Sequence, residues 1–407
     1  MANATTPAGP LDGIRVLDLT GVLMGPVATR TLGDLGADVI VIETAVGDRN
    51  RSMGPGPHDE FSGIALNLLR NKRSACIDLK HPRGRQAALD LAATCDVLVT
   101  NLRRGPLGRL GLGYDEVRAV RPDVVYCRAN GYPSDHPKAD APAYDDIVQS
   151  ATGFGDLFRL MDADPMLVPS LIADKVCGMA IANAVLAALF HRASTGDGQE
   201  VEVPMVDVMR AFILTEHGAG AIAEPPQTTA GYPRILTRER RPQRTADGWI
   251  NLLCYDDTHF NAVFTKGGRP ELVDDERILT RRSRTLNSDT LYRDVASVLP
   301  THTTEEWLRF CAEQGIPATE AATLDELVDQ LPLAQHPEVG AYRIIPPAER
   351  FATTPATVRR PAPMIGQHGR EVLVEIGYDR STIDELETLG VLGPPPSQTM
   401  RESELPQ

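Results

Sequence analysis

The stretch IRVLDLTGVLMGPVATRTLGDLGADVIVIE, residues 14–43, decides the fold of this chain. Its two apolar runs predict buried strands at 14–19 and 39–43. The segment between them predicts a helix over about 27–35, because Pro26 stands where proline favours a helix start. A strand, a helix and a strand in this order form a βαβ unit, so we expect a parallel sheet with helices on its faces.

Strands and helices keep alternating beyond this unit, which favours an α/β, doubly wound fold. Further strands are expected at 75–80, 96–100, 124–128 and 200–204, and helices at 82–93, 105–110, 114–120, 145–152 and 205–215. The composition then shifts towards a smaller α+β unit, with a strand at 249–253, a capping-box helix starting at 303–306 and a short helix at 323–327. From residue 337 the chain is expected to be extended, with a last helix at 381–390.

These patterns divide the chain into five predicted segments. They are a large domain at 8–215, a linker at 216–232, a small domain at 233–336, a return segment at 337–393 that completes the large domain, and a flexible tail at 394–407.

The composition excludes several functions. The formal net charge of −14 argues against binding nucleic acid or an anionic membrane. No apolar run reaches membrane-spanning length and the first residues lack a signal peptide's apolar core, so neither a membrane partner nor export is expected. The six cysteines are scattered without a C-x-x-C pair, which predicts free thiols in the cytoplasm and no metal site.

One carboxylate stands out. The apolar run at 169–173 ends in Asp174, and a long small-residue helix pattern follows, with no proline until Pro204. An Asp at this place can cap the helix by accepting hydrogen bonds from its first N–H groups, and the helix dipole favours the ionised form. From this stretch alone, the choice between a capping residue and a reactive acid stays open. Cys177, three residues further on, is expected to be a packed thiol.

Basic residues form two groups in the sequence. In the first group, Lys72, Arg73 and Lys80 lie at the strand 75–80, and Asn101, Arg103, Arg104 and Arg109 follow the strand 96–100; together they favour a phosphate-rich ligand. The second group is interrupted by Glu239 and has the pattern of a solvated loop face; it comprises Arg234, Arg238, Arg240, Arg241 and Arg244. A nicotinamide dinucleotide is a weaker alternative, because the first turn carries only Gly21 and Gly25 rather than G-x-G-x-x-G.

A series of short motifs resembles the class III CoA-transferases, the group of formyl-CoA transferase and carnitine CoA-transferase, which also includes the α-methylacyl-CoA racemases. The motifs occur in family order across nearly the whole chain: PLDGIRVLD (10–18), GP (25–26), LGADVIVIE (35–43), NKRS (71–74), NLRRG (101–105), LG (110–111), AYD (143–145), Asp174 with GM (178–179), GDGQ (196–199), ADG (246–248), GQH (366–368) and EVL (371–373).

The resemblance implies a Rossmann-like large domain built from both chain ends, a small domain between them, and an interlocked homodimer. It also implies that Asp174 is the nucleophile of CoA transfer from an acyl-CoA donor to a carboxylic acid, with CoA as substrate and no tightly bound cofactor. Thr44 stands where formyl-CoA transferase has an arginine beside the adenine, and that enzyme's glycine-rich lid has no counterpart before Asp247. Positions matching the family's CoA contacts are Val22, Leu23, Ile77, Lys80, Asn101, Leu102, Arg109 and Tyr144.

The implied chemistry is covalent catalysis. Ionised Asp174 attacks the thioester to give an acyl-aspartyl anhydride and CoA thiolate, and backbone N–H groups near Gly21 or the helix start are candidates to hold the oxyanion. The donor and acceptor acids are not encoded in a motif; the loop 132–143 and the small domain are expected to line their pocket.

Two alternatives to CoA transfer stay open. A racemase uses a His/Asp pair, but its histidine falls at Tyr144 and its glutamate near Asp257, and an unperturbed phenol is a poor base near neutral pH. A non-catalytic CoA-binding protein is the other alternative, and it requires that Asp174 be sequestered.

Overall fold

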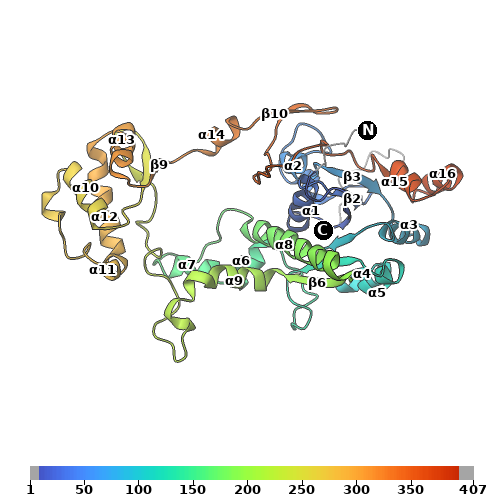
Figure 1. The fold of residues 1–407 in the computed structure, drawn as a ribbon, viewed down its shortest axis with the longest axis horizontal. Coiled ribbons are helices and arrows are strands. Elements are labelled where there is room, and N and C mark those ends of the chain that lie inside the picture. The colour runs from blue at the N-terminus through green and yellow to red at the C-terminus, as the bar shows by residue number, and fades with distance from the viewer. Residues whose placement is uncertain (1–8, 394–407) are drawn as a thin grey trace. The chain divides into compact units, whose positions relative to one another are not determined.

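The computed structural model describes residues 9–393, which form two compact units. Unit 1 contains the described residues up to Thr152, Val168–Arg210 and those from Leu331 onward, whereas unit 2 contains Gly153–Leu167 and Ala211–Gln330. Figure 1 shows the elements of both units.

Unit 1 is built on a six-stranded sheet in the order β3-β2-β1-β4-β5-β6, and every neighbouring pair is parallel. The strand order reverses between β1 and β4, as in doubly wound nucleotide-binding sheets. The α/β class and the parallel sheet expected from the sequence are therefore confirmed. The strands are β1 (Arg15–Leu19), β2 (Asp38–Glu43), β3 (Lys72–Cys76), β4 (Val97–Thr100), β5 (Val125–Asn130) and β6 (Gln199–Pro204).

Helices cover both faces of this sheet (Figure 1). On one face lie α1 (Met24–Asp34) and the long α8 (Ile172–Thr195), which pack tightly because a Cβ at Gly178 would come within 2.7 Å of the Met24 carbonyl oxygen. The other face carries the main apolar core under α3 (Pro82–Ala92), α4 (Arg104–Leu110), α5 (Tyr114–Val120), α15 (Gly369–Glu375) and α16 (Arg380–Thr388).

Strand β3 begins three residues earlier than the sequence predicted, and its first residues are buried ions. Lys72 is fully buried and its Nζ lies 3.0 Å from Asp18 Oδ2 and 2.7 Å from Thr29 Oγ1. Arg73 pairs with Asp38 and with Glu375. The expectation that Lys72 and Arg73 belong to an anion-binding surface is therefore wrong, because carboxylates of the same unit already neutralise both side chains.

Unit 1 also contains elements outside the sheet and the helices named above. They are α2 (Gly63–Leu68), α6 (Asp145–Ala151), the hairpin of β10 (Leu333–His336) and β11 (Gly340–Arg343), and the first turns of α9 (Met205–His217). The return segment 337–393 is not simply extended, since it contains the strand β11 and the helix α15 before α16. The predicted tail 394–407 lies outside the described residues.

Unit 2 has its own apolar core, centred on Phe264 and Trp307. The capping box predicted at 303–306 is present, because Thr303 and Glu306 exchange hydrogen bonds at the start of α13. Its elements are α7 (Phe154–Arg159), β7 (Gln243–Arg244), β8 (Trp249–Leu252), α10 (Asp257–Lys266), α11 (Arg281–Leu286), α12 (Ser288–Val298), α13 (Thr304–Gln314), β9 (Ala318–Glu320) and α14 (Leu324–Asp329), with short 3₁₀ turns at Arg49–Ser52 in unit 1 and at Ala219–Ile222, Pro270–Leu272 and Leu299–Thr301.

The boundaries of the two compact units differ from those of the predicted segments. Residues 153–167 fall in unit 2 although they were expected in the large domain, and the expected linker 216–232 also falls there. The first residues of α9 belong to unit 1 and the last to unit 2, so this helix connects the two.

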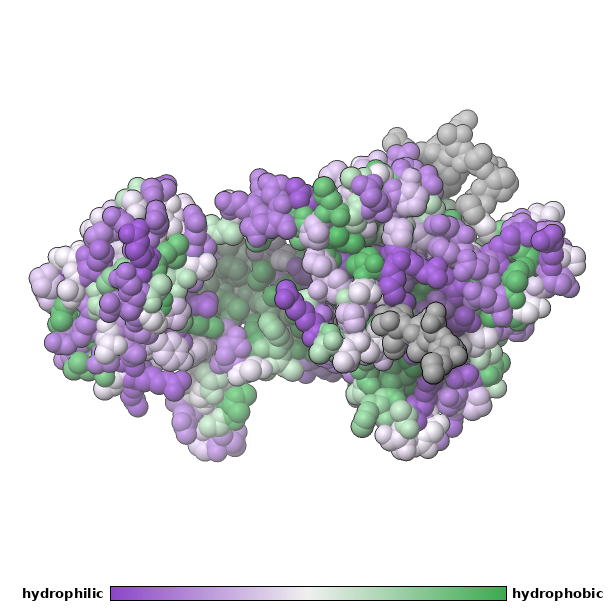
Figure 2. Space-filling view, turned by 45° about the horizontal axis from the view of Figure 1, so that its top comes forward, coloured by the Kyte–Doolittle hydropathy of each residue, from purple (hydrophilic) through white to green (hydrophobic). Residues whose placement is uncertain are grey.

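Helix α8 is the one helix among residues 9–393 that is long and apolar enough to cross a membrane by length and composition. Half of its most apolar window is buried within the protein, as in the core helix of a globular domain. Figure 2 shows a mostly hydrophilic surface interrupted by separate hydrophobic patches.

Candidate active site

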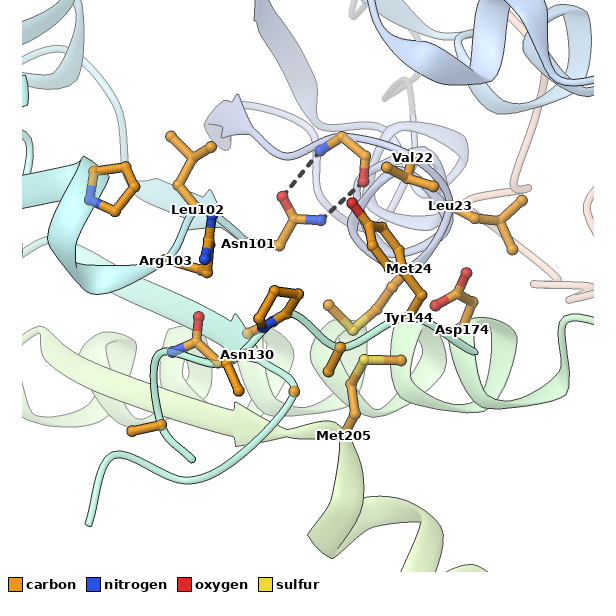
Figure 3. A pocket seen from close by; sticks show the side chains of 18 residues that line it. Val22, Leu23, Met24, Asn101, Leu102, Arg103, Asn130, Tyr144, Asp174 and Met205 are labelled. Atoms are coloured by element: carbon orange, nitrogen blue, oxygen red, sulfur yellow. Dashed lines mark hydrogen bonds between the residues drawn. The ribbon is translucent and has the colours of Figure 1, made fainter. Parts of the chain in front are cut away.

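The site lies where the strand order reverses. The chain leaves β1 at Gly21 and β4 at Asn101, and the Asn101 side chain joins the two loops: its Oδ1 accepts from the Gly21 N–H at 3.0 Å, and its Nδ2 donates to the Gly21 carbonyl at 2.8 Å. Figure 3 shows this pair of bonds. The crevice at such a reversal is where open α/β sheets bind their ligands.

Two cavities open at this crevice, both within unit 1. We call the first the Asp174 cavity; it has a volume of about 420 Å³. The second, the Lys80 cavity, has a volume of about 540 Å³. They share Gly21 and Leu102, so one elongated ligand can occupy both by crossing this point.

Most of the predicted contact residues divide between these cavities. The Asp174 cavity is lined by Val22, Leu23, Asn101, Leu102, Tyr144 and Asp174, and the Lys80 cavity by Ile77, Lys80 and Leu102. Arg109 lines neither cavity, because it projects from the exposed surface of α4. Thr44 lines the Lys80 cavity, at the wall where the resemblance would have placed an arginine.

Asp174 does not cap its helix. It is the third residue of α8, and the N–H groups of Ala173 and Asp174 both donate to Oδ1 of Asp145, at 2.7 and 3.1 Å. Asp145 in turn is bound by the Gln149 amide at 2.5 Å. The capping interpretation of Asp174 is therefore wrong: Asp145, from α6, satisfies the helix start, and the Asp174 carboxylate is free for another role.

The environment of Asp174 makes its carboxylate a stronger base than an ordinary aspartate. The residue is 8% exposed, and none of the described residues forms a hydrogen bond with its carboxylate. Burial, together with the charges of Asp145 and Asp146, raises its pKa to about 6. At neutral pH the side chain is still mostly ionised, and a carboxylate with a raised pKa is the better nucleophile. Figure 3 shows it pointing from α8 towards the loop that carries Leu23.

The loop between β1 and α1 is held under strain. Val22 has φ = 69°, a left-handed conformation that a β-branched residue rarely adopts. Its N–H donates to both carboxylate oxygens of Asp48 at 3.1 Å, and this contact fixes the loop. The N–H groups of Gly21 and Val22 are thus occupied, and so are the first N–H groups of α8. Of the oxyanion donors that the sequence suggested near Gly21 and at the start of α8, these groups are therefore not available.

Free N–H groups occur instead at the start of α1. Leu23 and Met24 line the Asp174 cavity, and within the described part of the chain their N–H groups have no hydrogen-bond partner. These groups also carry the partial positive charge of the helix N-terminus.

The Lys80 cavity presents one unpaired cation. Its Glu43 is neutralised by a buried ion pair with Arg51, and Asp48 is engaged by Val22 and Asn50. Burial raises the pKa of Asp48 above its usual range. The ammonium group of Lys80 is exposed and has no ion pair in residues 9–393, so it can meet an anionic group of a ligand.

Two groups near Asp174 have structural roles. Cys177 is fully buried, and burial together with the charge of Asp174 raises the pKa of its thiol to about 12, which leaves it inert as predicted. Met205, at the start of α9, also lines the Asp174 cavity.

The sequence did not identify Asp145 and Asp48 as positioning residues. Asp145 is part of the motif AYD and could have been noticed, whereas Asp48 lies in a loop without a recognisable pattern.

In the part of the chain that the structure describes, no group of three or more His, Cys, Asp or Glu side chains could hold a metal ion. All six cysteines are free.

The sequence of this chain is similar to those of known proteins over most of its length. The model of CoA-transferase family III matches residues 11–369. Succinyl-CoA:glutarate CoA-transferase of Mus musculus is 30% identical over 393 residues, covering 94% of this chain and 90% of that protein. The probable fatty acyl-CoA transferase Rv3272 of Mycobacterium tuberculosis is 33% identical over 385 residues, covering 89% of this chain and 97% of that protein.

Two solved structures superpose on this chain over most of its length. A crystal structure of Rv3272 superposes with a TM-score of 0.76 at 31% identity, covering 89% of this chain and 99% of that chain. A CAIB/BAIF family protein from Brucella suis superposes with a TM-score of 0.77 at 27% identity, covering 90% and 99%. This chain belongs to CoA-transferase family III, whose members are enzymes that use CoA thioesters as substrates.

Proposed function

We propose that this enzyme transfers CoA from an acyl-CoA thioester to a free carboxylic acid through a covalent intermediate on Asp174. The single observation that supports this most is the free, buried carboxylate of Asp174 in a cavity at the reversal point of the sheet, while Asp145 takes over the capping of α8. A carboxylate that serves only the fold would have hydrogen-bond partners.

The two cavities suit the two ends of an acyl-CoA. We place the nucleotide in the Lys80 cavity, where Lys80 meets a phosphate, and the thioester in the Asp174 cavity. The pantetheine arm then crosses Gly21 and Leu102, the residues common to both cavities. The exposed guanidinium group of Arg104, which follows β4, is a further candidate for the phosphates, whereas Arg103 lines the Asp174 cavity.

The exchange proceeds in four nucleophilic attacks. Asp174 attacks the thioester carbonyl, the carbon–sulfur bond breaks, and an acyl-aspartyl anhydride and CoA thiolate form. The thiolate attacks the aspartyl carbonyl and releases the donor acid, which leaves an aspartyl-CoA thioester. The acceptor carboxylate attacks this thioester to form a new anhydride, and the returning thiolate takes the acceptor acyl group and frees Asp174.

The free N–H groups of Leu23 and Met24 are the donors that we assign to the oxyanion of these steps. They line the same cavity as Asp174 and lie at the positive end of α1. Charge that develops on the thioester oxygen would meet these preorganised dipoles at no further cost of reorganisation.

We further propose that the enzyme is a homodimer, interlocked as in the family it resembles. In α8, a predominantly apolar helix, Met179 is 55% exposed and Phe190 is 77% exposed. Large apolar side chains left open on the longest helix mark a surface for protein contact. A second copy of this chain is the partner that the family resemblance implies.

The test is CoA exchange in Asp174→Ala, compared with Asp115→Ala as a matched control. Asp115 is also an aspartate in the first turn of a helix, but it is exposed and lines neither cavity. We expect Asp174→Ala to lose at least about a thousandfold in exchange rate, with an unchanged circular dichroism spectrum, while the control keeps the parent rate. Exchange at the parent rate in Asp174→Ala would overturn the proposal.

Racemase chemistry gives a different signature in the same preparation. A racemase would exchange the α-proton of a 2-methylacyl-CoA with solvent deuterium in the absence of any acceptor acid. We expect no such exchange, because the position of the racemase histidine is occupied by Tyr144.

A further inference from the structure

Asn130, the last residue of β5, is a buried amide that lines the Asp174 cavity. The residue is 8% exposed, and its Oδ1 has no hydrogen-bond partner among residues 9–393. Buried amides in folded proteins are nearly always hydrogen-bonded, because an unpaired one loses its contacts with water and gains none in return. An unpaired amide oxygen at the wall of a cavity therefore indicates a partner from outside the chain.

Other polar side chains of this cavity already have a partner or a role. Asn101 is bonded through both ends of its amide to the loop after β1. Arg103 is exposed and donates to the carbonyl of Asp140 at 3.3 Å. The carboxylate of Asp174 is the proposed nucleophile. Asn130 is thus a buried polar group of the cavity that neither the fold nor the transfer chemistry uses.

Asn130 lies on the side of the cavity where the arm of an acyl-CoA would enter. In the register of β4 and β5, Thr100 is level with Arg128, so Asn130 lies as far beyond this pair on β5 as Leu102 does after β4. Leu102 is one of the residues shared with the Lys80 cavity. Figure 3 shows the Asn130 amide turned towards the loop of Leu102, with Asp174 on the opposite side of the cavity. The ligand atoms beside Asn130 are therefore those of the arm rather than the reacting carbonyl.

Small side chains form the walls beside Asn130. They come from the end of β5 and from the loop that follows it, and they are Ala129, Gly131, Ala139, Ala141 and Ala143. A Cβ at Gly131 would come within 2.1 Å of the Ala143 Cβ, so this loop lies directly against the end of the strand. Walls of this kind suit a thin, unbranched chain that offers a polar group to the amide.

We propose that Asn130 binds the pantetheine amide nearest the sulfur of CoA, by accepting its N–H through Oδ1. The identity of the ligand rests on the proposed function, whereas the burial and the unpaired state of Asn130 do not. This part of CoA is an unbranched chain in which a short ethylene link joins a secondary amide to the sulfur. Its N–H is a donor, and a donor is what Oδ1 of Asn130 lacks.

The consequence of this contact is positional. A bond to the amide fixes how far the arm reaches into the cavity, and the ethylene link then limits where the sulfur can lie. The thioester is thereby held in one register for attack by Asp174, which is a contribution of orientation rather than of chemistry.

The experiment measures binding of CoA to the full-length protein by titration calorimetry. It compares CoA with an analogue in which an ester replaces the amide nearest the sulfur, because the ester keeps the carbonyl and loses the N–H. The parent should bind the analogue about tenfold more weakly than CoA. Asn130→Leu, which has a similar shape without hydrogen-bonding atoms, should bind CoA about tenfold more weakly and should bind both ligands within about twofold of each other.

Asn251→Leu is the matched control. Asn251 is also a strand asparagine, but it is exposed and lies in unit 2, so its variant should bind both ligands as the parent does. The melting temperature of the ligand-free protein separates binding from a structural role. Asn130→Leu should not lower it, because an apolar group of similar size replaces a buried amide oxygen that has no partner.

Three results would overturn the proposal. Unchanged CoA affinity in Asn130→Leu would show that the amide meets the acyl group or no ligand at all. A variant that still discriminates between amide and ester would place the partner of the N–H elsewhere. A lower melting temperature with unchanged affinity would assign Asn130 to the fold. Failure of the proposed function would appear separately, as CoA exchange that survives Asp174→Ala.

Discussion

At the residue scale, the unusual group is the Asp174 carboxylate, whose pKa of about 6 reflects burial and the neighbouring negative charges. The nucleophile must be ionised, so kcat/KM should rise with pH through about 6 and level off above it. A pH profile of the half-reaction between the enzyme and an acyl-CoA tests this expectation. A flat profile between pH 5 and pH 8 would contradict it, with the range chosen to span about one unit or more on each side of the pKa.

Asp145→Asn provides a matched variant for the same profile. The amide oxygen can still accept the N–H groups of Ala173 and Asp174, but the negative charge that raises the pKa of Asp174 is gone. The midpoint of the profile should therefore move to lower pH, and the melting temperature should fall, because the new amide NH2 faces the Gln149 Nε2 that donates to Asp145 Oδ2 in the parent. A midpoint that stays in place would show that Asp145 does not tune the nucleophile.

Burial of the ionised carboxylate also has a cost in stability. The folded-state pKa of Asp174 is raised above the unfolded value of about 3.9, so its contribution to stability is complete below pH 4 and is lost as pH rises towards 6. Asp174→Asn should then raise the free energy of unfolding by about 3 kcal/mol at pH 7 and by less than about 1 kcal/mol at pH 4. Denaturant titrations at both pH values measure it, and equal differences at the two would contradict the account.

The local pattern around Asp174 left its role open, and only the family resemblance implied a nucleophile. A carboxylate before an apolar helix is usually a cap, and only the structure shows that Asp145 takes that role from a different helix. The same reason explains the error at Lys72 and Arg73. Their partners, such as Asp18 and Asp38, come from strands that only the folded sheet brings alongside.

At the scale of elements, Asn101 connects the loops after β1 and β4, and it holds the residues shared by both cavities. Asn101→Ala leaves the N–H and carbonyl of Gly21 without these partners, so we expect a loss of about 1–2 kcal/mol in stability. The KM for acyl-CoA should rise about tenfold, since the crossing point of the ligand is loosened.

Asn101→Asp serves as the comparison, because it can still accept from the Gly21 N–H but cannot donate to its carbonyl. Its effect should be at least as large as that of Asn101→Ala, because a carboxylate oxygen then faces the Gly21 carbonyl oxygen. An unchanged KM in both variants would show that the tether does not shape the site.

Elements with a strong local signal were predicted well. The helix at 114–120 and the capping box at 303–306 are present as expected, because their signals depend on neighbouring residues alone. The helix α15 and the β10–β11 hairpin were missed in a proline-rich segment whose structure depends on packing against the rest of unit 1.

At the scale of the whole molecule, the exposed apolar side chains of α8 predict association. Sedimentation equilibrium should give the mass of two chains, and Phe190→Glu together with Met179→Glu should lower the dimer fraction or the melting temperature. Lys175→Glu, on an adjacent turn of the same helix, adds a comparable charge without removing an apolar contact. A monomeric parent, or a parent that sediments with liposomes, would contradict the proposal.

The family and the parallel sheet could be inferred from the sequence because a series of motifs follows the chain in order. Substrate choice could not, since it depends on cavities that the folded units create.

The central claim is a bond between Asp174 and the substrate. The direct measurement mixes enzyme with an acyl-CoA in the absence of acceptor, quenches with acid, digests the protein and weighs the peptide that contains Asp174. The account predicts a mass increase on Asp174 that matches an acyl or CoA adduct and that disappears when acceptor acid is added before the quench. An unmodified peptide, from a preparation shown to turn over, would contradict it.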